Sequence, residues 1–254
     1  MCVFAENVFI FFREEKSQTR ERSQGIFLII SPQTYVNHEY VILIWTGTRS
    51  DGGISVKNIV LIGILEYFAD WEAAYVSSFL QAMGQDRFCV KTVSLKNGPV
   101  RSMGGFTVLP DCDVLSAPED FAGLILIGGM SWRNEAARQI VPLVETAVRN
   151  KAVVGGICDA SAFLGTLGVL NTVRHTSNDL QDLQKWAGDA YTGASLYLRE
   201  PAVRDGMIVT ANGTASLEFA REVLTALGVA PEEQILAWYN YHKFGCYAAP
   251  VPEM

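Results

Sequence analysis

The stretch Val153-Val154-Gly155-Gly156-Ile157-Cys158-Asp159-Ala160-Ser161-Ala162-Phe163 decides the fold. Its first half is short and apolar, which predicts a buried strand ending at Ile157. Its second half predicts a helix from about Ala160, so the chain must turn sharply at Cys158. Gly156 and Ala160 lie two residues on either side of Cys158. This small-x-nucleophile-x-small spacing is typical of a nucleophile elbow.

An elbow would place the Cys158 side chain at the carboxyl end of a sheet, where α/β proteins hold their sites. The amino terminus of the next helix favours a thiolate, so we expect the pKa of Cys158 to be lowered. The alternative is an inert buried cysteine, which is common after an apolar strand. The rest of the chain has to decide between the two.

Outward from this stretch, apolar strands alternate with segments of helical spacing. The alternation predicts βαβ units, and hence an α/β fold with a mostly parallel, doubly wound sheet and helices on both faces, over residues 56–250. A polar, glycine-containing hairpin interrupts it near residues 97–109. The predicted strands are Asn58–Leu65, Phe88–Val93, Gly123–Ile127, Ala152–Ile157 and Met207–Thr210, and the predicted helices lie near Phe68–Ala82, Ala137–Val148, Leu180–Trp186, Leu217–Leu227 and Glu232–His242.

Residues 1–53 differ in character from the rest of the chain. Short apolar bursts surround a mixed-charge run, and Gly47-Thr48-Arg49-Ser50-Asp51-Gly52-Gly53 has the composition of a linker. We interpret this region as a poorly defined extension, and we favour a wrongly assigned start with translated upstream sequence, which would make it non-native. An expression remnant and a true extension that packs on a partner are the alternatives.

Composition excludes several classes of protein. The chain has 254 residues and a net charge of −7, so no broad basic surface for nucleic acid is expected. Five scattered cysteines without a CxxC pair indicate no zinc site and no disulfide framework, and suggest a reducing cytoplasm. No apolar run is long enough to span a membrane, and no GxGxxG motif opens a helix. We therefore expect no cofactor, no metal and no membrane.

Two features would complete a site around Cys158. Glu72 follows the first predicted strand, so it would reach the same sheet edge and act, when protonated, as a donor to sulfur. Gly128-Gly129 ends a neighbouring strand, and the amides of Gly129 and Asp159 would form an oxyanion hole. The alternatives are that Glu72 is an ordinary acidic residue in the first turn of a helix, and that Gly128-Gly129 is only a strand-ending turn.

The chain has three histidines. His175 lies in a polar loop after the elbow helix and is the best imidazole candidate, although a solvated loop histidine is the commoner case. His38 falls in the doubtful extension. His242 stands among aromatic residues, which favours a packing role.

Taken together, these residues resemble the DJ-1/PfpI family within the class I glutamine amidotransferase-like superfamily. The resemblance covers about residues 57–250 and rests on an ordered set of motifs. It implies a flavodoxin-like three-layer sandwich, usually dimeric, with Cys158 as nucleophile and Glu72 as its carboxyl partner. The motifs are Phe68-Ala69-Asp70-Trp71-Glu72, Leu126-Ile127-Gly128-Gly129, Gly156-Ile157-Cys158-Asp159-Ala160, Arg174-His175-Thr176 and Thr210-Ala211-Asn212-Gly213.

The sequence also departs from patterns found in this superfamily. PfpI-type proteases carry a histidine directly after the cysteine, whereas this chain has Asp159. True glutaminase domains supply a late histidine and glutamate pair, which this chain lacks. Both departures argue against peptidase and glutaminase activity proper. His175 matches a histidine that deglycase-like and glyoxalase-like members keep near the site.

Two functions from different classes fit these residues. The first is an enzyme whose Cys158 attacks a small carbonyl compound, an amide or a reactive aldehyde, by hydrolase-like or glyoxalase-like chemistry. The second is a stress-response protein in which the same cysteine senses oxidants without turnover. We expect a small-molecule substrate, a homodimer and no nucleic-acid partner. Trp71 and Trp132 are candidates to line a substrate pocket, although a core position is the commoner case.

Overall fold

The computed structural model describes residues 25–28, 42–45, 59–84 and 87–252. The chain divides into two compact units, Met1–Gly53 and Ile54–Met254. In the first unit, strand β1 (Gly25–Leu28) pairs antiparallel with β2 (Ile42–Trp45). The origin proposed above for residues 1–53 stays a prediction, and His38 lies outside the described residues.

The second unit is built on a seven-stranded sheet in the order β10-β11-β9-β8-β3-β4-β7. All neighbouring pairs are parallel except β10 with β11. The α/β fold with a mostly parallel, doubly wound sheet is therefore confirmed. The strands are β3 (Ile59–Gly63), β4 (Cys89–Ser94), β7 (Cys112–Asp113), β8 (Gly123–Leu126), β9 (Val153–Ile157), β10 (Ala202–Asp205) and β11 (Ile208–Ala211).

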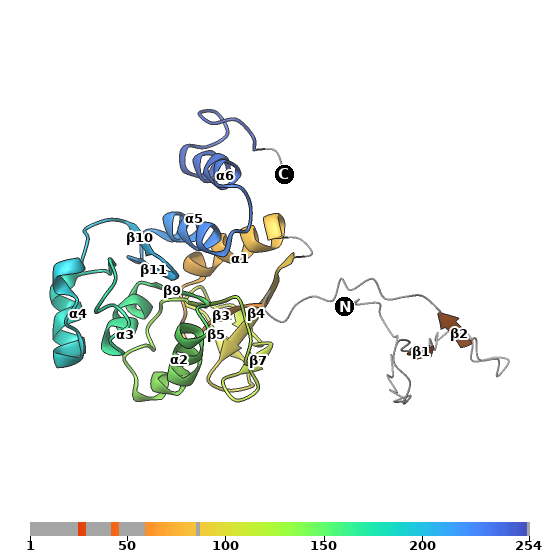
Figure 1. The fold of residues 1–254 in the computed structure, drawn as a ribbon, viewed down its shortest axis with the longest axis horizontal. Helices are drawn as coiled ribbons and strands as arrows, with labels where there is room; N and C mark the ends of the chain where they lie inside the picture. Colours follow the sequence, from red (N-terminus) through yellow and green to blue (C-terminus); the bar gives the residue numbers. More distant parts are fainter. Residues whose placement is uncertain (1–24, 29–41, 46–58, 85–86, 253–254) are drawn as a thin grey trace. The chain divides into compact units, whose positions relative to one another are not determined.

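Helices cover both faces of this sheet (Figure 1). On one face lie α1 and α5, with α6 packed against α5 on the side away from the sheet, and on the other lie α2 and α3, with α4 packed beside α3. The polar region near residue 100 forms a separate hairpin of two short strands, as predicted. The remaining elements are α1 (Asp70–Gly84), β5 (Val100–Arg101), β6 (Thr107–Val108), η4 (Glu135–Ile140), α2 (Val141–Arg149), α3 (Asp159–Thr166), α4 (Leu180–Ala187), η5 (Gly188–Ala190), η6 (Ala194–Leu196), α5 (Ser216–Leu227) and α6 (Glu232–Phe244).

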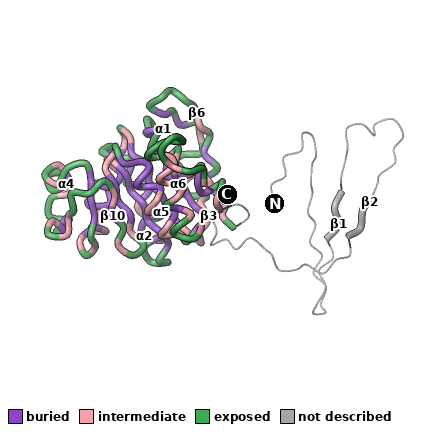
Figure 2. Tube along the Cα trace, turned by 90° about the horizontal axis from the view of Figure 1, so that it is seen from above, coloured by how far each residue is buried: buried purple, intermediate pink, exposed green. Residues whose placement is uncertain are grey.

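The core consists of two apolar layers, one on each face of the sheet. Side chains alternate along a strand, so Val60 and Ile62 of β3 join the layer under α1 and α5, and Leu61 joins the layer under α2 and α3. Figure 2 shows the buried residues running through the middle of this unit. Both faces of the central strands are covered, which explains why the sequence shows continuous apolar runs there.

The glycine pair in β9 lets helices approach from both sides. A Cβ at Gly155 would lie 3.0 Å from Phe219 Cζ of α5, and a Cβ at Gly156 would lie 2.8 Å from Leu164 Cδ1 of α3. Because consecutive residues face opposite sides of a strand, one glycine serves each layer. The position of both helices over β9 therefore depends on these two residues.

Sequence analysis did not predict strands β7 and β10, and it predicted the start of one α-helix too early. β7 is two residues long, and β10 is an edge strand with the polar sequence Ala-Val-Arg-Asp, so neither gives an apolar run. The helix predicted near Ala137–Val148 begins as the 3-10 helix η4 and becomes α-helical only at Val141.

Helix α6 is joined to α5 by polar contacts as well as by packing. Glu218 accepts hydrogen bonds from Lys243 Nζ at 2.7 Å and from Tyr239 Oη at 2.9 Å. The His242 ring contacts Tyr75 and Trp238, in line with the packing role expected of it.

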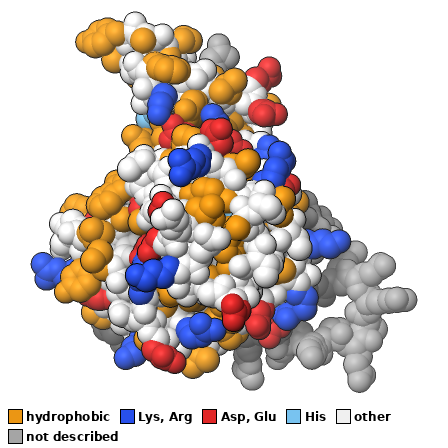
Figure 3. Space-filling model, turned by 90° about the vertical axis from the view of Figure 1, so that its left-hand side faces the viewer, with side chains coloured by type: hydrophobic (Ala, Val, Ile, Leu, Met, Phe, Trp, Pro, Cys, Tyr) orange, Lys and Arg blue, Asp and Glu red, His pale blue; other side chains and the backbone are white. Residues whose placement is uncertain are grey.

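The face drawn in Figure 3 mixes basic and acidic side chains, and apolar side chains gather at its projecting top. Within the described ranges, no helix is both long and apolar enough to cross a membrane.

We predict that Gly155→Ala lowers the free energy of unfolding by about 1–3 kcal/mol, because the new methyl group overpacks the space between Phe219 and Ile125. The matched control is Gly98→Ala, where an added Cβ meets no atom within 4 Å. Urea denaturation of both variants measures the effect. Equal stability of the two variants would contradict this account of β9.

Candidate functional site

Cys158 occupies the sharp turn that the sequence predicts between β9 and α3. Its backbone has φ 57° and ψ −132°, a conformation that non-glycine residues rarely adopt and that costs free energy. The turn is held by a hydrogen bond from the Cys158 amide to the Ala211 carbonyl at 3.0 Å. The hydroxyl of Ser161 donates to the Cys158 carbonyl at 2.6 Å. A strained turn fixed at both ends holds the thiol in one direction.

Small residues flank this turn for a steric reason. A Cβ at Gly156 would lie 2.8 Å from Leu164 Cδ1 and 3.1 Å from the Ala160 carbonyl oxygen. Leu164 and Ala160 belong to α3, which folds back over the end of β9. A larger residue at Gly156 would push this helix away from the strand.

Glu72 lies beside Cys158, as the predicted geometry requires. It stands in the first turn of α1, and its side chain is only 1% exposed. Its Oε2 accepts a hydrogen bond from the Gly128 amide at 2.8 Å, and its carboxyl group also hydrogen-bonds the Cys158 thiol. Burial raises the pKa of Glu72 to about 7, against the opposing effect of these two hydrogen bonds.

Two glycines enclose this carboxyl–thiol pair. A Cβ at Gly128 would lie 2.5 Å from the Cys158 Cβ and would also overlap Glu72 Oε2. A Cβ at Gly213 would lie 2.9 Å from Cys158 Sγ and 3.2 Å from Glu72 Oε1. The backbone therefore approaches the pair from two sides with no space for a side chain.

The Cys158 thiol has a raised pKa, which makes the expected lowering wrong in direction. Burial is the main cause, and the nearby charge of Glu72 adds to it. A hydrogen bond from the Asn178 side chain and one from the Asp159 amide act in the opposite direction but do not outweigh burial. The helix amino terminus is thus present, as predicted, but its effect is smaller than that of desolvation.

Asn178 is a site residue that the sequence analysis did not select. Its Nδ2 donates to Cys158 Sγ at 3.2 Å, and its Oδ1 accepts from the Gly213 amide at 2.8 Å. It therefore ties the sulfur to the loop that follows β11. The available signal was its place at the end of Arg174-His175-Thr176-Ser177-Asn178, the polar segment that also holds His175.

His175 is fully buried and does not contact the pair. Its Nδ1 donates to the Val173 carbonyl at 2.7 Å, so its Nε2 accepts from the Tyr191 hydroxyl at 2.6 Å. Burial lowers the pKa of His175, which keeps the ring neutral. With both ring nitrogens occupied, His175 is placed to support the segment that carries Asn178, and the proton-shuttling role expected of it has no geometric basis.

The two glycines after β8 make different contacts. The Gly128 amide already serves Glu72. Gly129 and Phe68 face each other in an isolated antiparallel β-bridge. Their neighbours make its hydrogen bonds: the Ala69 amide donates to the Gly128 carbonyl, and the Met130 amide donates to the Tyr67 carbonyl. This is the non-hydrogen-bonded position of an antiparallel bridge, so the bridge does not use the Gly129 amide. The Asp159 amide points at sulfur. These two amides remain the proposed oxyanion donors.

The Asp159 side chain is turned toward Arg133 instead of toward the sulfur. Arg133 Nε donates to Asp159 Oδ2 at 2.9 Å, and Arg133 Nη2 donates to Asp182 Oδ2 at 2.5 Å. The guanidinium also lies over the Trp186 ring, 4.8 Å from its centroid. Arg133 thus offsets the negative charge that Asp159 brings next to Cys158.

The two tryptophans expected as pocket candidates differ in position. Trp132 is 1% exposed and donates to the Ile127 carbonyl at 2.7 Å, so it belongs to the core. Trp71 is 49% exposed and donates to the Gly213 carbonyl at 3.3 Å, beside the site. No cluster of three or more metal-ligating side chains occurs in the part of the chain that the structure describes.

The arrangement brings together one thiol, one carboxyl group beside it and the backbone amide of Asp159. These are the groups that covalent attack on a carbonyl carbon needs. A proton carrier with a pKa of about 7 is half ionised at neutral pH, which suits general acid–base work.

A family model described as the DJ-1/PfpI family matches residues 58–226. Among curated proteins, the chain is 34% identical over 184 residues to the "Uncharacterized protease YdeA" of Bacillus subtilis. It is 32% identical over 190 residues to the "Uncharacterized protease YoaZ" of the same organism. Each match covers 72% of this chain and 90% of the relative.

Solved structures give the same result. A ThiJ/PfpI family protein from Bacillus anthracis is 31% identical with a TM-score of 0.69, over 75% of this chain and 92% of its own. A DJ-1 superfamily protein from Agrobacterium tumefaciens is 35% identical with a TM-score of 0.65, over 73% and 99% of the two chains. The flavodoxin-like sandwich expected from the resemblance is therefore confirmed.

We predict that iodoacetamide labelling of Cys158 has a midpoint above the ordinary thiol value of 9.0, because burial disfavours the thiolate. Asn178→Ala removes a donor to sulfur and should slow labelling at pH 8 about threefold. Peptide mass spectrometry across a pH series measures both. Asn97→Ala, in an exposed turn, serves as the control. A midpoint below 9.0 would contradict the dominance of burial.

Glu72 should make the free energy of unfolding depend on pH. Its folded-state pKa is about 7 against an ordinary value of 4.5, so the folded state binds the proton more tightly. The stability that this group contributes is full below pH 4.5 and is lost as pH rises through 7.

We therefore predict that Glu72→Gln gains about 3 kcal/mol relative to the wild type between pH 4.5 and pH 8. Urea denaturation at each pH measures the difference, and Glu145→Gln on the exposed side of α2 serves as the control. Parallel stability curves for the wild type and Glu72→Gln would show that the carboxyl group has an ordinary pKa.

Proposed function

The chain belongs to the DJ-1/PfpI family, and from this premise we propose that it is an enzyme that adds the Cys158 thiol to a small carbonyl compound. The observation that carries the proposal is the buried Glu72 carboxyl group in contact with that thiol. Our preferred substrate class is the 2-oxoaldehydes, which the protein would convert into 2-hydroxy acids.

Proton transfer explains why the pair favours addition chemistry. The raised pKa of Cys158 keeps it a neutral thiol at pH 7, so a base must remove its proton during attack. Glu72 is the base in contact with the sulfur, and its pKa of about 7 leaves a substantial carboxylate fraction. The reactive thiolate then forms only when substrate is present.

The lack of an imidazole around the sulfur, among the described residues, favours an aldehyde over an amide. Among the described residues, the polar groups that interact with the Cys158 thiol are the Asn178 side-chain amide, the Asp159 backbone amide and the Glu72 carboxyl group. None of these is an imidazole. Amide cleavage must pass the thiol proton on to a strongly basic leaving amine, and an imidazole carries that proton in the well-known cases. Aldehyde addition has no leaving group, and one carboxyl group can move every proton.

The first step forms the S–C bond. Glu72 takes the thiol proton as Cys158 Sγ bonds to the aldehyde carbon, and the carbonyl π electrons move onto oxygen. The Gly129 and Asp159 amides stabilise that negative charge. Glu72 then returns the proton to this oxygen, which gives a hemithioacetal.

The second step moves hydrogen within the adduct. Glu72 removes the proton from the former aldehyde carbon, which gives an enediolate, and the hydroxyl proton of that carbon passes to the neighbouring oxygen. Glu72 then delivers its proton to the neighbouring carbon, so the first carbon is oxidised and the second is reduced. The product is a thioester of a 2-hydroxy acid. Water cleaves the thioester, and the overall reaction adds one water to the 2-oxoaldehyde.

Hydrolysis of amides is the related alternative within this proposal. The two curated relatives are named as proteases, and a thioester is also the intermediate of cysteine-dependent hydrolysis. Asp159, held by Arg133, stands where PfpI-type proteases have histidine, which supports the aldehyde. A homodimer and a reducing cytoplasmic setting remain predictions of the sequence.

We predict that the wild type converts methylglyoxal to lactate and that Cys158→Ser abolishes turnover. Glu72→Gln should lower kcat/KM at least about tenfold, since general acid–base catalysis typically contributes about 10²–10⁴-fold. In the wild type, kcat/KM should rise with pH through about 7 as Glu72 ionises. Enzymatic lactate detection and a chromogenic amide, run in parallel, separate the two reactions.

Cys112→Ser is the matched control, because Cys112 is buried in β7 and far along the sheet from β9. Turnover that survives in Cys158→Ser would remove the nucleophile from the proposal. Selective peroxide oxidation of Cys158 in a protein that turns over neither substrate would favour the redox-sensing alternative instead.

A further inference from the structure

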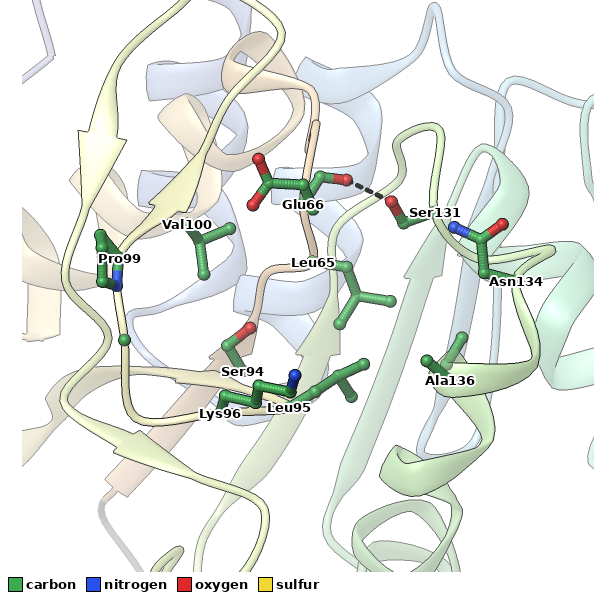
Figure 4. A pocket seen from close by; sticks show the side chains of 12 residues that line it. Leu65, Glu66, Ser94, Leu95, Lys96, Pro99, Val100, Ser131, Asn134 and Ala136 are labelled. Carbon is green, nitrogen blue, oxygen red and sulfur yellow. Dashed lines mark hydrogen bonds between the residues drawn. The ribbon is translucent and has the colours of Figure 1, made fainter.

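A second cavity lies on the same edge of the sheet but does not include Cys158 or Glu72. Its volume is 340 Å³, which falls within the range of small-molecule sites. Figure 4 shows side chains from the segments after β3, β4 and β8 converging on it. The residues that the argument uses are Leu65, Glu66, Ser94, Lys96, Val100 and Ala136.

The topology of the sheet marks this cavity as a place for a ligand. The chain runs from β3 to β4 in one direction along the sheet and later from β8 to β9 in the other, and β3 and β8 are neighbours. Open α/β sheets bind ligands where the direction of winding switches, outside the carboxyl ends of the strands. Leu65 and Glu66 follow β3, and Ser131 follows β8, so the cavity lies at that switch.

Ser94 presents its hydroxyl to this cavity. The residue is 4% exposed and belongs to the cavity lining. In Figure 4 its hydroxyl is directed into the space between Leu65 and Val100. A hydroxyl that points into a cavity can donate a hydrogen bond to a polar ligand atom or accept one from it.

Two opposite charges stand on opposite sides of the cavity. Figure 4 places Glu66 at one side and Lys96 at the other, next to Ser94, with Leu65 between them. Among the described residues, neither belongs to an ion pair. The Glu66 carboxylate accepts one hydrogen bond, from the Arg101 amide at 3.2 Å. The apolar walls between the charges come from Leu65, Leu95 and Val100.

We propose that this cavity binds a small zwitterion whose ammonium and carboxylate groups lie at opposite ends of a partly apolar body. Glu66 holds the ammonium group. Lys96 and the Ser94 hydroxyl hold the carboxylate, and the apolar walls cover the middle of the ligand. A dipeptide and an ω-amino acid both have this chemistry, and the volume accommodates either.

The site is separate from the reactive cysteine. The Phe68–Gly129 bridge stands between Glu66 and Glu72 along one segment and between Gly128 and Ser131 along the other. The cavity lining includes Glu66 and Ser131 but does not include Glu72, Gly128 or Cys158. Binding therefore does not require the Cys158 thiol, and its failure is distinguishable from failure of the proposed reaction.

Isothermal titration of the full chain with alanyl-leucine and with 6-aminohexanoate tests the proposal. We expect saturable binding in the wild type and equal binding in Cys158→Ser. N-acetyl-alanyl-leucine lacks the ammonium group and alanyl-leucinamide lacks the carboxylate, so each should bind at least about tenfold more weakly than alanyl-leucine. Saturable binding of either zwitterion supports the proposal. The tighter of the two shows whether the site prefers a dipeptide or an ω-amino acid.

Variants locate the binding. Glu66→Gln and Lys96→Met should weaken alanyl-leucine at least about tenfold, and Ala136→Trp should abolish binding by filling the cavity from its exposed rim. Glu145→Gln and Lys185→Met, both exposed on other helices, should leave binding unchanged. Unchanged melting temperatures establish that the exposed-site variants are folded.

Three results would overturn the proposal. They are no saturable binding of either zwitterion, equal binding of alanyl-leucine and its acetylated form, and loss of binding in Cys158→Ser with retention in Glu66→Gln and Lys96→Met. The last result would place the ligand at the cysteine.

Discussion

The contact between the buried Glu72 carboxyl group and the Gly128 amide is the constraint on which the site depends. A carboxyl group that is 1% exposed needs polar partners to be tolerated, and this amide supplies one while the Cys158 thiol supplies another. Gly128 must lack a side chain, because a Cβ there would overlap both Glu72 and Cys158. One glycine thus determines how close the acid and the nucleophile lie.

The parallel sheet makes this meeting possible. Glu72 follows β3, Gly128 follows β8, Cys158 follows β9 and Gly213 follows β11, and these four strands are consecutive neighbours. The carboxyl ends of parallel strands share an edge, so residues far apart in the sequence meet there without long loops. The order of strands therefore leads directly to the chemistry of the site.

The sequence predicted the parts of the structure that have a local signal. The central strands are apolar on both faces, and the flanks of Cys158 must be small, so β3, β8, β9 and the turn were all predictable. β7 and β10 were missed because short or polar edge strands carry no apolar run. Glu72 was found from topology, since any residue just after β3 reaches the same edge.

The features that the sequence could not reveal depend on burial and on side-chain direction. The helix amino terminus beside Cys158 was correctly located, but the sign of its pKa shift is set by desolvation, which is a property of the whole fold. His175 and Asn178 lie three residues apart in one segment, and it is Asn178 that hydrogen-bonds the sulfur, whereas a search for catalytic residues selects the histidine. Their different positions follow from hydrogen bonds that only the folded chain makes. The His175 ring is held by the Tyr191 hydroxyl, and the Asn178 side chain is held by the Gly213 amide.

The raised pKa values of Cys158 and Glu72 have a common physical origin, and this bears on how the pair works. Both groups are buried, so the site disfavours two negative charges, and the carboxylate itself raises the pKa of the thiol. Proton transfer from sulfur to Glu72 moves one charge within the pair and creates no second one. Attack on a carbonyl then passes that charge to an oxygen facing backbone amides. A nucleophile that is neutral at rest and activated by its neighbour needs no standing thiolate, which is why a raised thiol pKa is compatible with catalysis here.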